Sequence, residues 1–364
     1  MADDASPLDG YRQFVALSGD VFVLSVAMFA FSLGFQMTTR FGNLISALYP
    51  YPGGAVSDRI GSRYALTLFG AASTLGFLLW AIAPSFGTLT IGGLTIQPWL
   101  WVFVGLILAQ AWKSFGLGAT FAIVKQSVPP ERLARGFAST ETFRRSAFLL
   151  GPVLAAGLLA LHPDFTVSFR YVLVVAVVVG LVATAVQHVL YDASDDSFGE
   201  TVEGLSQLRS DLRSLPSPLR PLLIGDTLVR FANGMVYVFF IIVVTEFLDV
   251  GLSVSLPGVG GVDLAPATFF GLLLGVEMVV ALVVMAPAAA LAERVGLKPV
   301  VATGFAVYAI FPILLISAPP NAAVLAALFA FSGLRFAGLP AHKALIVGPA
   351  AADAGGRVTG SYYL

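Results

Sequence analysis

The chain has 364 residues, of which 57% are hydrophobic and only 11% are charged, and its mean hydropathy is +0.88. A soluble domain carries about 25% charged residues, and its core cannot hold this much apolar side chain without leaving large exposed patches. The composition therefore excludes an ordinary soluble protein and predicts one embedded in a lipid bilayer. The absence of cysteine also excludes disulfides and thiolate metal sites.

The apolar residues fall in runs long enough to cross about 30 Å of hydrocarbon at about 1.5 Å per helical residue. Strands of a membrane barrel would instead alternate over segments of about ten residues. We therefore predict an all-α polytopic membrane protein. Its ten spans cover approximately residues 20–39, 41–57, 64–84, 99–124, 140–161, 168–190, 221–247, 267–290, 299–317 and 322–346, and residues 358–364 resemble the start of an eleventh.

Lys and Arg are concentrated on one side of these spans. With the N-terminus inside, the outer side keeps only Arg40 and Arg170, and most other basic residues fall in inner loops or at inner helix ends. The positive-inside rule then places the N-terminus and the segment 192–220 in the cytoplasm. This segment has apolar residues at steps of three and four, which predicts an amphipathic helix lying either on the membrane surface or against other protein loops.

Two parts of the chain repeat each other. Gly54-Ala-Val-Ser-Asp-Arg-Ile-Gly-Ser-Arg63 matches Ala289-Ala-Leu-Ala-Glu-Arg-Val-Gly-Leu-Lys298 at an offset of 235. Lys113-Ser-Phe-Gly-Leu-Gly-Ala119 matches Arg335-Phe-Ala-Gly-Leu-Pro-Ala341 at an offset of 222. Internal repeats of this kind are typical of secondary transporters, in which two halves rearrange around a central site.

The first of these segments closely resembles the signature loop of the major facilitator superfamily: a glycine, three residues, Asp-Arg, one residue, a glycine, one residue and a base. The segment 129–136 resembles the superfamily's loop between spans four and five. Gly151-Pro152 partly resembles its antiporter motif, although Ala155 and Ala156 stand where glycines are usual. The resemblance implies a 12-helix plan, with residues 1–191 as the first half, 192–220 as the linker and 221–364 as the second half.

In the superfamily this loop is the inner gate, and the resemblance implies gating roles for one set of residues in each copy. The first set is Gly54, Asp58, Arg59, Gly61 and Arg63, and the second is Glu293, Arg294, Gly296 and Lys298. The chemistry agrees, because Gly61 tolerates the backbone angles of a tight turn and Asp58 can form ion pairs that break on opening. The alternative is a plain turn on the positive side of the membrane.

Ionisable residues inside the spans are the candidates for a substrate or proton site. At the bilayer centre such a residue costs at least about 2.5–3.5 kcal/mol, so it has a function or a partner. Lys113 and Arg335 lie midway along spans four and ten, at equivalent places in the repeat. Two cations facing a central cavity would suit an anionic substrate.

The opposing interpretation is internal pairing. Asp226 and Arg230 can meet on one helix face, and Glu277 or Asp226 could neutralise Arg335 or Lys113. An embedded carboxylate such as Glu277 could also carry the proton of a proton-coupled transporter. Gln36 and Gln110 offer hydrogen bonds either to a cavity or between helices.

The repeat also indicates two deficits. Span two, with Pro50 and Pro52, is short. Spans one and two together are shorter than two bilayer-crossing helices require, which predicts that about twenty residues after Arg40 are missing relative to the superfamily. The chain also stops where span eleven would begin, which predicts a transporter truncated before its last two helices or an incomplete gene model.

Together these features predict a secondary transporter of a small molecule that works by alternating access, is driven by H⁺ and, from the antiporter fragment, serves efflux. The substrate is either a hydrophobic, drug-like molecule or a small organic anion bound by Lys113 and Arg335. The alternative from another class is a truncated membrane protein that does not transport. We expect a monomer in the cell membrane, with no enzymatic activity, cofactor, metal site or nucleic-acid partner.

Overall fold

The computed structural model describes residues 50–194 except 92–93, residues 219–349 except 238 and 257–259, and the single residues 213, 217, 359 and 362. Contacts divide the chain into two compact units, an N-terminal unit with the described residues from 50 to 216 and from 346 on, and a C-terminal unit with those from 217 to 345. Predicted span 20–39, most of 41–57 and most of the linker 192–220 lie outside the described residues, as does Gln36.

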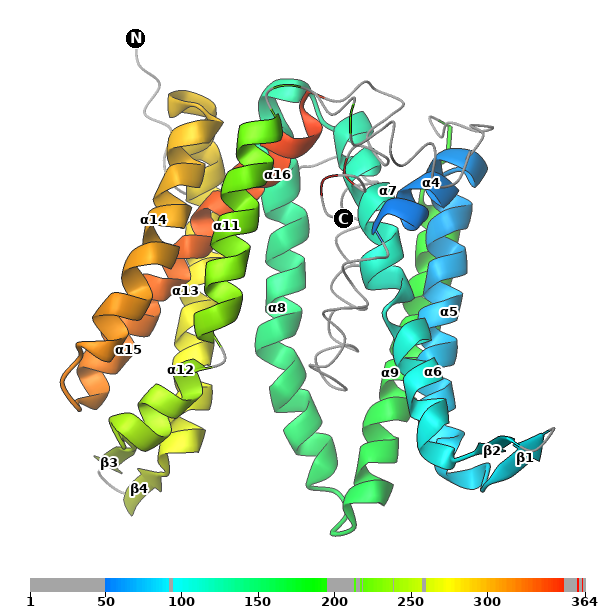
Figure 1. Ribbon diagram of the computed structural model, residues 1–364, viewed down its shortest axis with the longest axis horizontal. Coiled ribbons are helices and arrows are strands. Elements are labelled where there is room, and N and C mark those ends of the chain that lie inside the picture. The colour runs from blue at the N-terminus through cyan, green and yellow to red at the C-terminus, as the bar shows by residue number, and fades with distance from the viewer. Residues whose placement is uncertain are drawn as a thin grey trace. The chain divides into compact units, whose positions relative to one another are not determined.

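Helices build nearly all of the N-terminal unit, in blue to green in Figure 1. In chain order they are α4 (Pro50–Ile60), α5 (Ser62–Ile82), the 3-10 turn η1 (Ala83–Ser85), strands β1 (Leu89–Ile91) and β2 (Leu94–Ile96), α6 (Pro98–Ala109), α7 (Ala111–Ser127), the turn η2 (Pro130–Arg132), α8 (Leu133–Leu159) and α9 (Phe165–Leu190). β1 and β2 form an antiparallel hairpin with Leu89 opposite Ile96.

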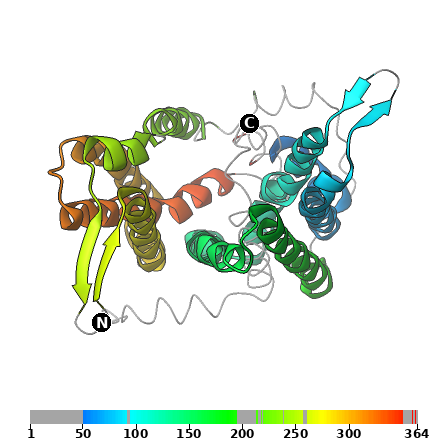
Figure 2. The same ribbon diagram turned by 90° about the horizontal axis from the view of Figure 1, so that it is seen from below.

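The C-terminal unit follows a similar plan. Its elements are α11 (Leu219–Tyr237), α12 (Phe239–Ile242), the π-helical turn η3 (Val243–Phe247), strands β3 (Leu252–Leu256) and β4 (Gly260–Leu264), α13 (Pro266–Val295), α14 (Leu297–Ile316), α15 (Ala322–Gly333), the 3-10 segment η4 (Leu334–Gly338) and α16 (Leu339–Val347). β3 and β4 pair antiparallel, and Figure 2 shows the helices of this unit nearly end-on beside the hairpin.

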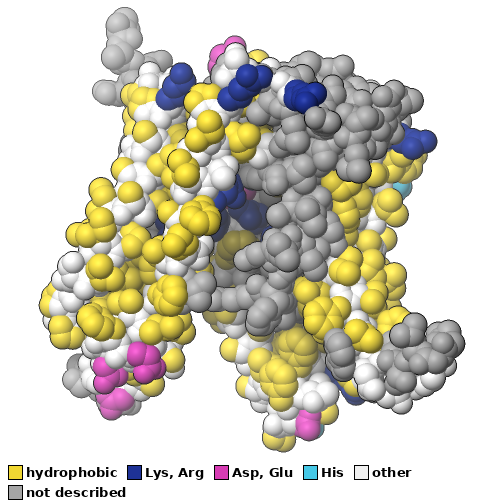
Figure 3. Space-filling view, viewed as in Figure 1, with side chains coloured by type: hydrophobic (Ala, Val, Ile, Leu, Met, Phe, Trp, Pro, Cys, Tyr) yellow, Lys and Arg dark blue, Asp and Glu magenta, His cyan; other side chains and the backbone are white. Residues whose placement is uncertain are grey.

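Seven helical segments of the described chain are long and apolar enough to cross a membrane. They cover residues 62–85, 100–127, 165–190, 219–247, 266–295, 297–316 and 322–347. In Figure 3 hydrophobic side chains cover the flanks of the helices in each unit. Such exposed apolar flanks are stable in lipid rather than in water, so the prediction of an all-α integral membrane protein is confirmed.

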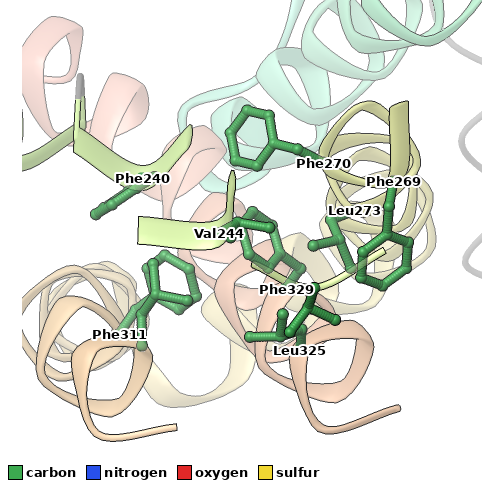
Figure 4. Packing of buried hydrophobic residues seen from close by; sticks show 10 residues of the cluster. Phe240, Val244, Phe269, Phe270, Leu273, Phe311, Leu325 and Phe329 are labelled. Atoms are coloured by element: carbon green, nitrogen blue, oxygen red, sulfur yellow. The ribbon is translucent and has the colours of Figure 1, made fainter. Parts of the chain in front are cut away.

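The core of the C-terminal unit is aromatic. Phe311 packs edge-to-face on both Phe240 and Phe329, with ring centroids 5.1 and 5.3 Å apart, and Phe329 packs in the same way on Phe270. Figure 4 shows that these rings come from four helices, α12, α13, α14 and α15, and meet in one cluster. Edge-to-face pairs add about 0.5–1.5 kcal/mol each beyond their buried area, so this cluster holds the unit's helices together near the hairpin.

Spans four and ten, which the sequence predicted as continuous helices, are both interrupted. α6 ends at Ala109 and α7 starts at Ala111, whereas α15 gives way to η4 after Gly333. Ser73 occupies the first break, because its hydroxyl donates to the Ala109 carbonyl at 3.0 Å and accepts from the Trp112 N–H at 2.8 Å. Each break lies just before one of the two repeated intramembrane cations.

Two close contacts recur in both units. A Cβ on Gly116 would lie 3.0 Å from Leu66, and one on Gly338 would lie 3.2 Å from the Cα of Val301. Gly116 corresponds to Gly338 at the offset of 222, and Leu66 to Val301 at the offset of 235. The sequence repeat therefore corresponds to a repeated packing of span three against four and of span nine against ten.

Candidate functional site

A buried ion pair occupies the middle of the C-terminal unit. Arg335 Nη2 lies 2.6 Å from Glu277 Oε1, and the two side chains are only 5% and 3% exposed. The Ser332 hydroxyl donates to the same carboxylate oxygen at 2.6 Å. These contacts require close helices, and a Cβ on Gly333 would lie only 2.7 Å from the backbone oxygen of Glu277. The glycine thus allows α15 to approach α13 and brings the three polar side chains together.

Aromatic rings surround the Arg335 guanidinium. Its Cζ lies 5.0 Å from the ring centroid of Tyr308 and 4.8 Å from that of Phe336. Both distances fall within the range of cation–π attraction. The Nε of Arg335 is buried and has no hydrogen-bond partner among the described residues. Arg335 is therefore held by one carboxylate and two rings while one of its donors stays available.

A second ionic cluster joins α11 to α16. Arg230 Nε lies 2.7 Å from Asp226 Oδ2, and His342 Nε2 lies 3.8 Å from Asp226 Oδ1. Asp226 and His342 are buried, whereas Arg230 is 54% exposed. The Asp226–Arg230 contact predicted from their spacing is present. Within the described residues no three His, Asp or Glu side chains are placed to hold a metal ion.

The corresponding cation of the N-terminal unit, Lys113, lies in the first turn of α7. It is half-buried, and the positive charge of Arg144 on α8 opposes its own. Its neighbour Trp112 is buried and donates through Nε1 to Gln187 on α9 at 3.1 Å. Gln110 is fully buried at the α6–α7 break. Gln110 is therefore placed next to Lys113 along the chain, at the irregular point of span four.

α8 carries a buried acid that the sequence analysis did not select. Glu141 is fully buried, and Arg144 holds it through Nε at 3.1 Å and through Nη2 at 2.5 Å. Arg145 Nε lies 3.8 Å from the same carboxylate, and both guanidiniums lie over Phe148. α8 starts at Leu133 rather than at residue 140 as predicted, so these arginines lie well inside the helix and not at its inner end.

The two copies of the signature loop have the same backbone form. Gly61 and Gly296 have φ of 84° and 92° and join α4 to α5 and α13 to α14. Asp58 and Gly54 are buried on α4, whereas Arg59 is exposed. In the second copy Glu293 is half-buried and Arg294, Gly296 and Lys298 are exposed.

Arg63 stabilises the end of another helix. Its Nε donates to the backbone oxygen of His188 at 2.7 Å, close to the C-terminus of α9. The Thr67 hydroxyl lies 2.9 Å from Nδ1 of the same histidine. A cation at a helix C-terminus is favoured by the helix dipole. Arg63 therefore connects the signature loop to α9, a contact that the sequence did not predict.

The sequence profile described as "Major Facilitator Superfamily" matches residues 14–363, which is nearly the whole chain. The chain belongs to the Major Facilitator Superfamily. The predicted membership of this superfamily is thereby confirmed, and it makes the chain a secondary transporter by family. No curated protein sequence matches the chain.

Solved structures of superfamily transporters share the fold at low sequence identity. The fucose:proton symporter of E. coli has a TM-score of 0.69 and 14% identity, with 94% of this chain and 87% of that chain covered. A bacterial homologue of the iron transporter ferroportin has a TM-score of 0.65 and 15% identity, with 94% of this chain and 87% of that chain covered. The human organic anion transporter TETRAN has a TM-score of 0.58 and 16% identity, with 95% of this chain and 89% of that chain covered.

Sequence reasoning missed two residues that contact the ionisable side chains inside the helices, Ser332 and Glu141. Ser332 donates to the carboxylate of Glu277, and Glu141 contacts Arg144 and Arg145. Glu141 could have been found, because it stands three and four residues before Arg144 and Arg145. Ser332 could not, because its partner Glu277 is 55 residues away.

Proposed function

We propose that this superfamily member couples the movement of a small molecule to H⁺ by alternating access, with Glu277 as the proton-carrying carboxylate. The observation that carries the proposal is the buried contact of Glu277 with Arg335 and Ser332. A carboxylate in such a site has two distinct states. Deprotonated, it holds Arg335 by charge, and protonated, it loses the charge that binds the guanidinium.

The position of Glu277 suits this role. It lies eleven residues from Pro266 at the start of α13, about 17 Å at about 1.5 Å per residue, in a hydrocarbon core about 30 Å thick. An ionisable residue near the bilayer centre usually marks a substrate path or a proton relay. Since Glu277 is neutral only when protonated, its proton occupancy controls whether Arg335 has an internal counter-ion.

The fold relatives agree with H⁺ as the coupling ion. Two of them are described as a fucose:proton symporter and a proton:xylose symporter. The signature-loop residues, with Asp58 buried and Gly61 at the turn, are proposed as the inner gate, on the cytoplasmic side with the N-terminus and the linker. We further propose that the protein acts as a monomer in the cell membrane.

A small organic anion is the second candidate substrate. The fold relative described as an organic anion transporter is compatible with it. Arg335 is already paired with Glu277, so Arg335 would bind an anion only when Glu277 is protonated. Anion and proton would then move in the same direction, whereas the antiporter fragment at Gly151-Pro152 on α8 favours exchange. The direction of proton movement during transport therefore distinguishes co-transport of an anion with H⁺ from exchange against H⁺.

Proteoliposomes loaded with a pH-sensitive dye test the proposal. Fucose, xylose, succinate and phosphate are added outside, and internal pH is followed for the unmodified protein, Glu277→Gln and the matched control Glu246→Gln, whose carboxylate is exposed. We expect at least one compound to change internal pH with the unmodified protein and the control but not with Glu277→Gln. Unchanged proton movement in Glu277→Gln would exclude Glu277 as the proton carrier.

A further inference from the structure

The N-terminal unit contains a cluster of cations that the proton-coupling mechanism leaves unused. We call Lys113, Arg144, Arg145 and the buried Glu141 the α7–α8 charge cluster. Arg144 and Arg145 both contact Glu141, and the charge of Arg144 acts on Lys113. Two arginines thus hold one carboxylate inside a single unit, and the charge of one of them reaches Lys113.

These side chains lie deep in the membrane. Lys113 is fourteen residues before Ser127 at the end of α7, and Arg144 is eleven residues after Leu133 at the start of α8. Because the short turn 128–132 joins those two helix ends, the distances of about 21 and 17 Å are measured from the same side, at about 1.5 Å per residue. Both cations therefore lie near the middle of a hydrocarbon core about 30 Å thick.

Arg144 is fixed in orientation but keeps donors to spare. All its hydrogen bonds among the described residues go from Nε and Nη2 to Glu141, and its Cζ lies 5.4 Å from the ring centroid of Phe148. A guanidinium has five N–H donors, so the edge turned away from Glu141 can bind a second acceptor. The side chain is 23% exposed, whereas Glu141 is 0% exposed. Glu141 thus acts as a buried positioning residue behind a reachable guanidinium.

We propose that Arg144 and Lys113 bind the anionic group, a carboxylate or a phosphate, of the transported molecule within the N-terminal unit. The inference rests on the proposed transport function and names its substrate class. A planar guanidinium edge next to a lysine ammonium matches the oxygen atoms of either group. Arg335, which the sequence predicted for this task together with Lys113, is occupied by Glu277. The anion is therefore bound by the cations of the N-terminal unit, while the C-terminal unit handles the proton.

Binding can be measured without transport. The full chain is purified in detergent, and its tryptophan fluorescence is titrated with sodium phosphate and, separately, with sodium succinate. Sodium chloride keeps the ionic strength constant. Trp112 is adjacent to Lys113 and buried, so it should report an anion there. We expect the tryptophan fluorescence to change saturably with anion concentration. The apparent Kd should rise at least tenfold in Arg144→Gln and in Lys113→Gln. The matched control Arg170→Gln removes an exposed arginine at the start of α9 and should leave the Kd unaltered.

The outcomes are separable. Saturation by phosphate alone assigns the site to phosphate esters, saturation by succinate alone assigns it to carboxylates, and loss in both cation variants supports the proposal in either case. No saturable change in the unmodified chain, or equal affinity in Arg144→Gln and Lys113→Gln, overturns it. If Arg144→Gln does not fold because Glu141 loses its main partner, Lys113→Gln decides, since Arg144 and Arg145 still contact Glu141 in that variant.

The anion-binding proposal and the proton-coupling proposal can each be refuted without the other. A chain that binds the anion through Arg144 but shows no proton movement in liposomes keeps the anion site and loses the coupling mechanism. A chain that moves protons with fucose or xylose but binds neither anion keeps the coupling and loses the site.

Discussion

Gly61 and Gly296 adopt nearly the same backbone conformation, with φ and ψ of 84° and 150° in the first and 92° and 159° in the second. They are 235 residues apart and stand at equivalent positions of the two signature loops. This region of backbone space is essentially restricted to glycine. Both turns therefore depend on the absence of a Cβ, and the repeat has kept the same helix-to-helix turn in both units.

Replacing either glycine by alanine should destabilise its turn. We expect Gly61→Ala and Gly296→Ala each to lower the free energy of unfolding by about 1–3 kcal/mol, the usual cost of a strained backbone. Gly157 on α8 provides the control, because a Cβ there would meet nothing within 4 Å. Thermal unfolding of the detergent-purified proteins measures the effect. Equal unfolding temperatures for Gly61→Ala and Gly157→Ala would show that the turn is not constrained as described.

A close helix approach should control the Glu277 site. Gly333→Ala places a Cβ 2.7 Å from the Glu277 backbone oxygen, so α15 must move away from α13 and weaken the Ser332 hydrogen bond. Gly275→Ala, on α13 but in open space, is the matched control. We expect Gly333→Ala to impair proton-coupled transport and Gly275→Ala to leave it near the unmodified level. Similar activity in the two variants would mean that the helices adjust without disturbing the site.

The contact of Arg63 with α9 gives a local prediction. Arg63→Gln removes a charge-assisted hydrogen bond to the His188 oxygen, which is worth about 1.5–3 kcal/mol. Arg59→Gln removes a neighbouring but exposed arginine and should have little effect. Hydrogen–deuterium exchange should therefore rise at the C-terminal end of α9 in Arg63→Gln alone. Faster exchange there in both variants would indicate a general effect of charge on the loop.

The Glu277–Arg335 pair should show energetic coupling. Each single change, Glu277→Gln or Arg335→Gln, leaves one partner of a buried pair alone, at a cost of about 3–5 kcal/mol. The double variant should lose less than the sum of the two, with a coupling of about 0.5–3 kcal/mol. Thermal unfolding of the four proteins gives the cycle. Strictly additive losses would contradict a direct interaction.

Most of the helical framework could be predicted from hydropathy. Predicted spans 168–190 and 299–317 correspond to α9 and α14 within a few residues, because apolar length is fixed by the bilayer. The breaks in spans four and ten could not be predicted, since Ser73, a residue from span three, fills the first of them. Local sequence carries no signal for a side chain that arrives from another helix.

The candidate site could be predicted only in part. Glu277, Arg335, Asp226 and Arg230 were identified because a charge inside an apolar run is costly. The Asp226–Arg230 contact followed from helical spacing, but Arg335 had several possible partners, and only the close approach at Gly333 selects Glu277. Glu141 was overlooked because α8 was expected to begin at residue 140, which placed Arg144 and Arg145 at a helix end.

The most direct test of the central claim compares two modes of transport in Glu277→Gln. Liposomes containing the protein are given a compound that the unmodified protein carries, first in exchange for the same compound inside and then under an imposed pH gradient alone. The account predicts that Glu277→Gln retains exchange and loses accumulation driven by the gradient, while Glu246→Gln retains both. Gradient-driven accumulation at the unmodified level in Glu277→Gln would contradict it.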